Sequence, residues 1–225
     1  MTETEASAPA PIADQFAAGP PVANAALVGV PTFMVGAIAL ALNLTNYVPQ
    51  TLVGAPIAII LLATGLGQTI ATIFALRAGE SAVASVFGIF GGFWLSYGAF
   101  VLGVLHNWYG FTTPAPGASP AAAAAAAATN IENAQKLFLL SWLILIVVLT
   151  LVSLRLPMAF TLLFVLVDLA LLFVLLSVIN ASATQQKIGG YFTWGFIVIG
   201  AVLFYDAMSA ATGGKNLPLG RPIIK

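Results

Sequence analysis

The amino-acid sequence predicts an all-α, polytopic membrane protein with six transmembrane helices and both termini in the cytoplasm. Three observations lead to this fold class. Of the 225 residues, 60% are hydrophobic and only 6% are charged, whereas a soluble domain carries about 25% charged residues. Six apolar runs are long enough to cross a hydrocarbon core, which takes roughly 20 helical residues. The basic residues are also divided unevenly between the segments that connect these runs.

Local start signals accompany several of the predicted helices. We expect the six helices near residues 27–45, 55–76, 82–105, 135–154, 157–179 and 188–210. Pro56 and Pro157 lie in the first turns of two runs, where a helix has no N–H partner to lose. The capping box Thr129-Asn130-Ile131-Glu132 predicts the start of the fourth helix. Pro31, just inside the first run, predicts a broken or late-starting helix there.

The segments outside the runs complete the predicted domain organisation. Residues 1–26 form a flexible N-terminal tail, and residues 211–225 form a C-terminal tail. The first Lys or Arg is Arg77, so the basic region of a secretory signal is missing and the first run is a retained span. Residues 106–134, rich in Ala and Pro, are expected to be an exposed loop, with any helix confined to the residues just before the fourth span.

The basic residues predict the orientation of the bundle in the membrane. With six spans, both termini lie on the same side. That side carries five Lys and Arg residues, and the other side carries two, Lys136 and Lys187. Cytoplasmic segments are enriched in Lys and Arg, so both termini are expected in the cytoplasm. The five residues are Arg77, Arg155, Lys215, Arg221 and Lys225.

Composition excludes several classes of function. The net charge is zero, so no basic field attracts nucleic acid. The chain has no cysteine and a single histidine, His106. Disulfides, a thiolate nucleophile, Cys-ligated zinc or iron and a His-cluster metal site are therefore excluded. No nucleophile–base pair is recognisable either, so we expect a protein that is not an enzyme and carries no metal or cofactor.

Polar residues inside membrane spans are candidates for function because their burial in lipid is costly. Asp168 lies near the middle of the fifth span, and no Lys or Arg lies within a span core to pair with it. It is either a proton-binding or pore-lining group or a buried acid that ties two helices together. Asp206 lies near the end of the last span, where a structural role is favoured. The other candidates are Asn43, Gln68, Ser96, Tyr97 and Asn180.

The third run carries the most specific motif in the chain. Gly88-Ile89-Phe90-Gly91-Gly92-Phe93-Trp94-Leu95-Ser96 resembles the third-span signature of the acetate uptake transporter family. Gln68 lies where that family has a glutamine. Asn24-Ala25-Ala26-Leu27-Val28-Gly29-Val30 resembles an altered copy of the family's N-terminal Asn-Pro-Ala-Pro-Leu-Gly-Leu. Asn43-Leu44-Thr45-Asn46 resembles the polar end of the family's first span.

This resemblance implies a function, an assembly and a set of site residues. It implies a homohexamer in the plasma membrane, in which each six-helix protomer passes acetate and related small monocarboxylates, including succinate in some cases, as a channel or proton-linked permease. The family's hydrophobic constriction falls on Phe33, Phe90 and Leu169. Many relatives have tyrosine at the position of Phe90, and several have an uncharged residue at that of Asp168. The substrate-contacting or pore-lining residues are expected to be Asn24, Asn43, Gln68, Trp94, Asp168 and Asn180.

Two other interpretations of the function remain open. The altered N-terminal motif, Phe90 in place of tyrosine and the Ala-rich loop leave room for a non-transporting accessory subunit of a larger membrane complex. A membrane-embedded enzyme is the poorest reading, because the sequence shows no catalytic set.

Overall fold

The computed structural model describes residues 24–224, and within them six helices are long and apolar enough to cross a membrane. The six predicted spans are therefore confirmed; the first 23 residues of the predicted N-terminal tail lie outside the described residues. The second span consists of a π-helical segment, η2, followed by α3. The helices are α2 (Ala26–Leu44), η2 (Ile59–Leu66), α3 (Gly67–Arg77), α4 (Ser81–Leu105), α5 (Pro120–Ser153), α6 (Met158–Ile179) and α7 (Ala183–Ala211).

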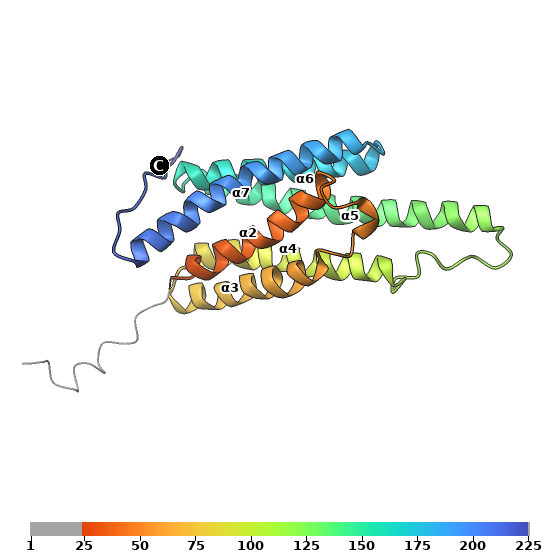
Figure 1. The fold of residues 1–225 in the computed structure, drawn as a ribbon, viewed down its shortest axis with the longest axis horizontal. Coiled ribbons are helices and arrows are strands. Elements are labelled where there is room, and N and C mark those ends of the chain that lie inside the picture. The colour runs from red at the N-terminus through yellow and green to blue at the C-terminus, as the bar shows by residue number, and fades with distance from the viewer. Residues whose placement is uncertain (1–23, 225) are drawn as a thin grey trace, which may run out of the picture.

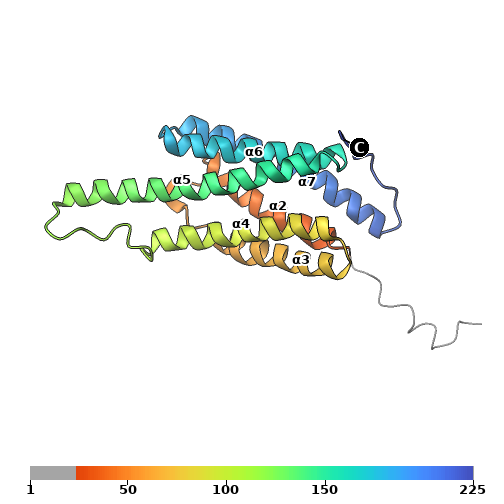
Figure 2. The ribbon, with the colours of Figure 1, turned by 180° about the vertical axis from the view of Figure 1, so that it is seen from behind.

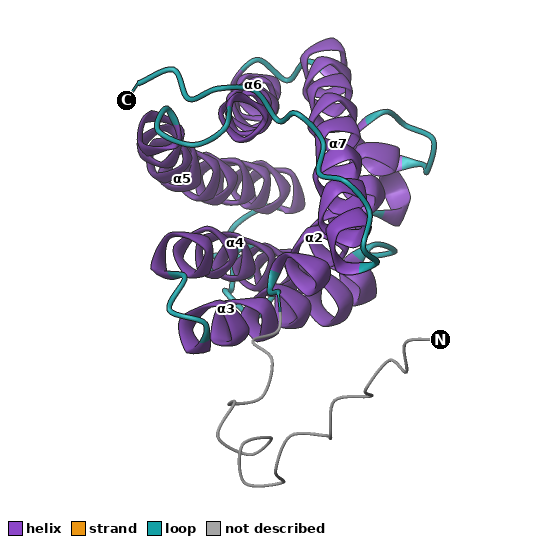
Figure 3. Cartoon of the chain, turned by 90° about the vertical axis from the view of Figure 1, so that its left-hand side faces the viewer, coloured by secondary structure: helices purple, strands orange, loops and turns teal. Residues whose placement is uncertain are grey.

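Successive spans run in opposite directions (Figures 1 and 2). One end of the bundle, called the terminal end below, carries the starts of α2, α4 and α6 and the ends of α3, α5 and α7. The opposite end is called the loop end. Helix α7 packs against α2 and α6, α5 packs against α6, and α3 packs against α4. Helices α4 and α5 face each other with few backbone contacts, as the view along the bundle shows (Figure 3).

Glycines let α2 cross the second span closely. A Cβ atom on Gly36 would lie 2.3 Å from Thr64 Oγ1, and one on Gly67 would lie 2.5 Å from Thr32 Cγ2. Both distances are far below van der Waals contact, so only glycine fits at these crossings. The close approach fixes Phe33 on α2 and Gln68 on α3 relative to each other.

The fourth span starts earlier than the sequence predicted. Ser119 is the N-cap of α5, with its Oγ accepting from Ala122 N at 3.3 Å, and Pro120 occupies the first turn. The alanines that follow are helical, in keeping with the high helix propensity of alanine. The 34-residue helix is about 51 Å long at 1.5 Å per residue, so it extends beyond a hydrocarbon core of about 30 Å.

Residues 106–119 are non-helical, as the predicted loop requires, whereas residues 120–134 are helical, so the helix start predicted from the capping box at Thr129 is wrong. The connection between α4 and α5 ends at Ser119. The Thr129 hydroxyl lies within the helix and donates to Ala125 O at 3.1 Å, and Glu132 pairs with Lys136 one turn later. The Ser-Pro pair gives the helix an earlier start, which the capping-box motif alone does not reveal.

The expected break at Pro31 is also wrong, because α2 continues through this residue. Side chains supply donors to the carbonyls beside the proline. Thr32 Oγ1 donates to Val28 O at 2.7 Å, and Gln68 Nε2 donates to Gly29 O. Pro31 itself removes only the N–H donor to Leu27 O, and the two side-chain bonds add to the backbone bonds of the neighbouring carbonyls. The other two prolines behave as predicted: Pro157 is the N-cap of α6, and Pro56 directly precedes the first helical residues of the second span.

Candidate functional site

Two cavities lie in line within the bundle. The loop-side cavity has a volume of about 70 Å³ and extends toward the loop end, as far as Leu44 and Tyr97. The terminal-side cavity has a volume of about 390 Å³ and extends toward the terminal end, as far as Asn24 and Asn216. Only about 10–15 Å³ of such space is needed to hold a water molecule.

Phe33 and Phe90 line both cavities and separate them. Their ring centroids are 4.8 Å apart in an edge-to-face arrangement. Phe164 lies 6.0 Å from Phe90, and Phe196 lies 5.6 Å from Phe33. All four side chains are buried. We call these four residues the aromatic partition, because their rings form an apolar contact between the two cavities.

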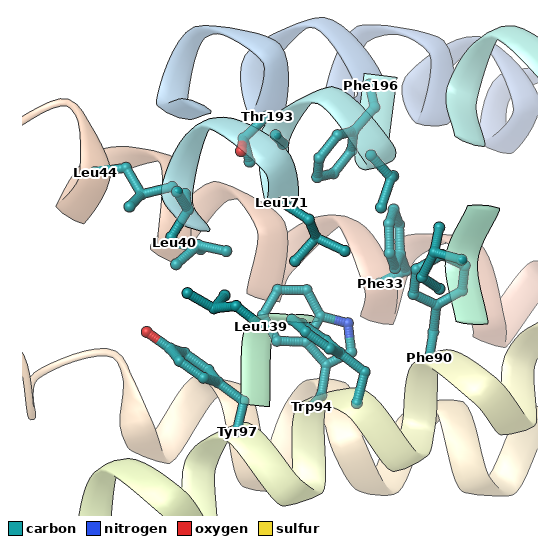
Figure 4. Close-up of a pocket in the computed structure, with 15 residues that line it drawn as sticks. Phe33, Leu40, Leu44, Phe90, Trp94, Tyr97, Leu139, Leu171, Thr193 and Phe196 are labelled. Carbon is teal, nitrogen blue, oxygen red and sulfur yellow. The ribbon is translucent and has the colours of Figure 1, made fainter. Parts of the chain in front are cut away.

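The loop-side cavity is almost entirely apolar. Figure 4 shows Phe33 and Phe90 at one end of it, with Leu40, Leu44 and Tyr97 toward the other. The hydroxyl of Thr193 donates to Gly189 O at 2.9 Å, so its proton is already used. The indole Nε1 of Trp94 is buried and, among the described residues, has no hydrogen-bond partner. Trp94 lies in the lining as predicted, 6.3 Å from Phe33 between ring centroids.

The terminal-side cavity holds the polar groups of the pathway. Asn24 Oδ1 accepts from Ala26 N at 2.9 Å, which leaves its amide nitrogen as a donor. Asp206 Oδ1 accepts from Leu217 N at 2.5 Å. Within residues 24–224, neither cavity is lined by Lys, Arg or His. The four polar lining residues are Asn24, Gln68, Asp206 and Asn216.

Gln68 is fully buried beside the proline of α2. Its Nε2 donates to Gly29 O and, at 3.2 Å, to Thr32 Oγ1. A backbone carbonyl can only accept, so this contact fixes which way the amide points. Its Oε1 is buried and has no partner among the described residues. Gln68 therefore both supports α2 and leaves an acceptor near the terminal-side cavity.

Leu169, predicted as the third constriction residue, lines neither cavity. It is half-buried, whereas Leu171 is buried and lines the loop-side cavity. Two positions along an α-helix rotate the side chain by about 200°, so the two leucines point to nearly opposite faces of α6. The lining of the loop-side cavity therefore includes Leu171 of α6, while Leu169 as a constriction residue stays a prediction.

Asp168 also lies outside both cavities. Its Oδ2 accepts from Thr150 Oγ1 at 2.7 Å, which joins α6 to α5. Of the two interpretations that the sequence left open, this geometry matches the one in which a buried acid ties two helices together.

Two asparagines that were predicted as pore-lining lie near helix ends. Asn43 is buried near the end of α2, and Asn180 is the exposed C-cap of α6, where it donates to Gln185 Oε1 at 3.0 Å. Neither asparagine lines a cavity.

Sequence reasoning missed Phe164, Phe196, Leu171 and Asn216 as lining residues. Phe164 and Leu171 lie in a run so uniformly apolar that no periodic pattern distinguishes its inner face. Asn216 follows the last span, in a segment that was interpreted only as a tail.

Comparisons with known proteins place the chain in a family. The solved structure of the bacterial acetate channel SatP has a similar fold: the match covers 88% of this chain and 99% of that chain, with 21% sequence identity and a TM-score of 0.68. Comparison with curated protein sequences gives no match. The model of the GPR1/FUN34/yaaH family matches residues 12–223, which confirms the resemblance drawn from the third-span motif. The chain therefore belongs to the GPR1/FUN34/yaaH family.

Proposed function

We propose that this chain is a membrane channel or transporter for acetate and related small monocarboxylates, with succinate at the upper limit of size. The observation that carries the proposal is the pair of cavities aligned along one bundle and separated only by the aromatic partition. Family membership and the similarity of fold to a protein described as an acetate channel support it. This function needs no cofactor and no catalytic residue.

The partition selects what passes. An apolar constriction excludes hydrated ions because they would have to shed water without compensation. A monocarboxylate as small as acetate presents a methyl group to the rings and one polar group to be satisfied. Trp94 Nε1 offers a hydrogen bond on the loop side of the partition, and Asn24 and Gln68 offer hydrogen bonds on the terminal side. In this account Leu171 takes the place given to Leu169, and Asp168 has a structural role.

The proposal also includes the orientation of the protein, its membrane and its oligomeric state. Four basic residues lie at or beyond the terminal end, and Lys187 lies in the first turns of α7 at the loop end. This distribution supports a cytoplasmic location for both termini in a plasma-membrane protein. The outer face of α5 exposes apolar side chains that would lie against lipid or a second copy, in keeping with the homohexamer that the resemblance implies. The four basic residues are Arg77, Arg155, Lys215 and Arg221.

The direct test is uptake of labelled acetate into proteoliposomes of the purified protein, with and without an inward proton gradient. We expect protein-dependent, saturable flux above that of empty liposomes, and the response to the gradient shows whether protons travel with the solute. Empty liposomes are the essential control, because acetic acid crosses lipid unaided. Folded protein without excess flux would overturn the proposal, and co-purification with an enzyme complex at fixed stoichiometry would favour the accessory role.

A further inference from the structure

The C-terminal segment forms part of the wall of the terminal-side cavity. We call residues 215–224 the C-terminal strap. It leaves the end of α7 and crosses the terminal end of the bundle toward α5 (Figure 3). Between its attachments, Asn216 and Leu219 contribute to the cavity lining. A segment that follows the last span is thus built into the pathway.

Backbone hydrogen bonds attach the strap to two helices. Leu219 O accepts from Ala159 N at 3.0 Å in the first turn of α6. Leu154 O, at the end of α5, accepts from Ile223 N and Ile224 N, each at 3.0 Å. These bonds satisfy backbone groups that helix ends leave unpaired. They involve no side chain, so side-chain substitutions leave them in place.

Side chains of α7 hold the near end of the strap. Asp206 Oδ1 accepts from Leu217 N at 2.5 Å, and Ser209 Oγ donates to Lys215 O at 3.1 Å. Asp206 is 8% exposed and lines the cavity, whereas Ser209 is half-buried and does not line it. A carboxyl group in such a place is costly unless it is hydrogen-bonded. The strap supplies that hydrogen bond, and the carboxyl group in turn holds Asn216 and Leu219 against the cavity.

We propose that Asp206 is a positioning residue that latches the C-terminal strap and thereby sets the size of the terminal-side opening. With the latch closed, Asn216 and Leu219 narrow the opening. With the latch open, the strap swings on its remaining backbone bonds and larger solutes enter. The size-selection part of this inference rests on the proposed transport function, whereas the latch itself does not.

The absence of cysteine from the chain makes the latch directly measurable. A single Leu219→Cys substitution, at a half-buried position of the cavity lining, reports the exposure of the strap through its rate of reaction with a membrane-impermeant maleimide. In combination with Asp206→Ala we expect the rate to rise about tenfold, the change that loss of one hydrogen bond produces. Ser81→Cys, exposed at the start of α4 on the same side of the bundle and outside the cavity lining, is the control whose rate stays constant.

The Asp206→Asn variant distinguishes the hydrogen bond that residue 206 accepts from the charge of its side chain. The asparagine keeps an oxygen that can accept from Leu217 N but removes the carboxylate. We expect Asp206→Asn to match the wild type in labelling rate and in the ratio of gluconate to acetate flux, and Asp206→Ala to raise both. If Asp206→Asn behaves like Asp206→Ala, the residue acts through its charge and the latch is refuted.

If Asp206→Ala does not fold, a second variant tests the same hydrogen bond. Leu217→Pro removes the N–H donor while keeping Asp206, so it must raise the labelling rate at position 219 in the same way. An unchanged rate in a folded variant of either kind overturns the latch. If the wild type carries no acetate, the proposed function fails, while the labelling rates still decide whether Asp206 holds the strap.

Discussion

Replacing Phe90 with alanine should open the path between the two cavities. Phe90 is 4% exposed, and its ring is the one that contacts both Phe33 and Phe164. Without it, the cavities of about 70 and 390 Å³ join through the space that the ring vacates. We expect Phe90→Ala to admit solutes that the intact partition excludes, and therefore to lose selectivity rather than flux.

The stability cost of this substitution follows from the same contacts. Two aromatic pairs are lost, at 4.8 and 6.0 Å between centroids. Each such pair contributes about 0.5–1.5 kcal/mol beyond the burial of the ring, and truncating a buried Phe to Ala costs about 3–5 kcal/mol in all. For a chain of this size the melting temperature should therefore fall by about 6–20 °C. The variant should therefore fold and be measurable.

The assay compares flux of labelled acetate with that of gluconate, a bulkier monocarboxylate that crosses lipid slowly. Phe93→Ala is the matched control, since Phe93 lies on the same helix and contacts Trp94, Tyr97, Phe138 and Trp142 but lines only the loop-side cavity. We expect gluconate to pass through Phe90→Ala and not through Phe93→Ala. Gluconate exclusion by a folded Phe90→Ala variant would refute the role of the partition.

Three further predictions concern residues around the partition. Gln68→Leu removes the donor to Gly29 O and should lower the free energy of unfolding by about 1–3 kcal/mol, seen as a lower melting temperature. Asp168→Asn keeps an acceptor for Thr150 and lies outside both cavities, so acetate flux at every pH should equal that of the wild type; a changed pH profile would instead support the proton-binding interpretation. Gly36→Val would place its Cβ 2.3 Å from Thr64 Oγ1 and should cost about 1–3 kcal/mol or more, whereas Gly88→Ala, with its nearest neighbour at 3.4 Å, should melt close to the wild type.

The number and order of the spans could be predicted from the sequence because hydropathy alone determines them. Bilayer thickness demands about 20 apolar residues per helix, and the six runs satisfy that demand wherever their side chains point. The start of α5 could not be placed in the same way. Both Ser119-Pro120 and the motif at Thr129 are valid start signals, and the choice depends on whether the intervening alanines fold, which they do.

The site could be predicted only where a motif fixed the register. Phe90 and Trp94 of the third-span motif line the cavities, as do Asn24 of the N-terminal motif and Phe33, which the resemblance assigned to the first span. Large apolar side chains lie on all faces of α6, so Leu169 and Leu171 are equivalent by composition and only packing separates them. Asp168 could be singled out from the sequence because it is charged, but its hydrogen-bond partner on α5, Thr150, can be identified only from the fold.

The measurement that most directly tests the proposed pathway uses these two leucines. Leu171→Cys places a thiol in the loop-side cavity, and Leu169→Cys places one outside it, in a chain that otherwise has no cysteine. A methanethiosulfonate reagent should stop acetate flux through Leu171→Cys proteoliposomes, and a reductant should restore it, while Leu169→Cys stays active. If labelled Leu171→Cys carries acetate at the wild-type rate, the solute does not pass through this cavity and the account is wrong.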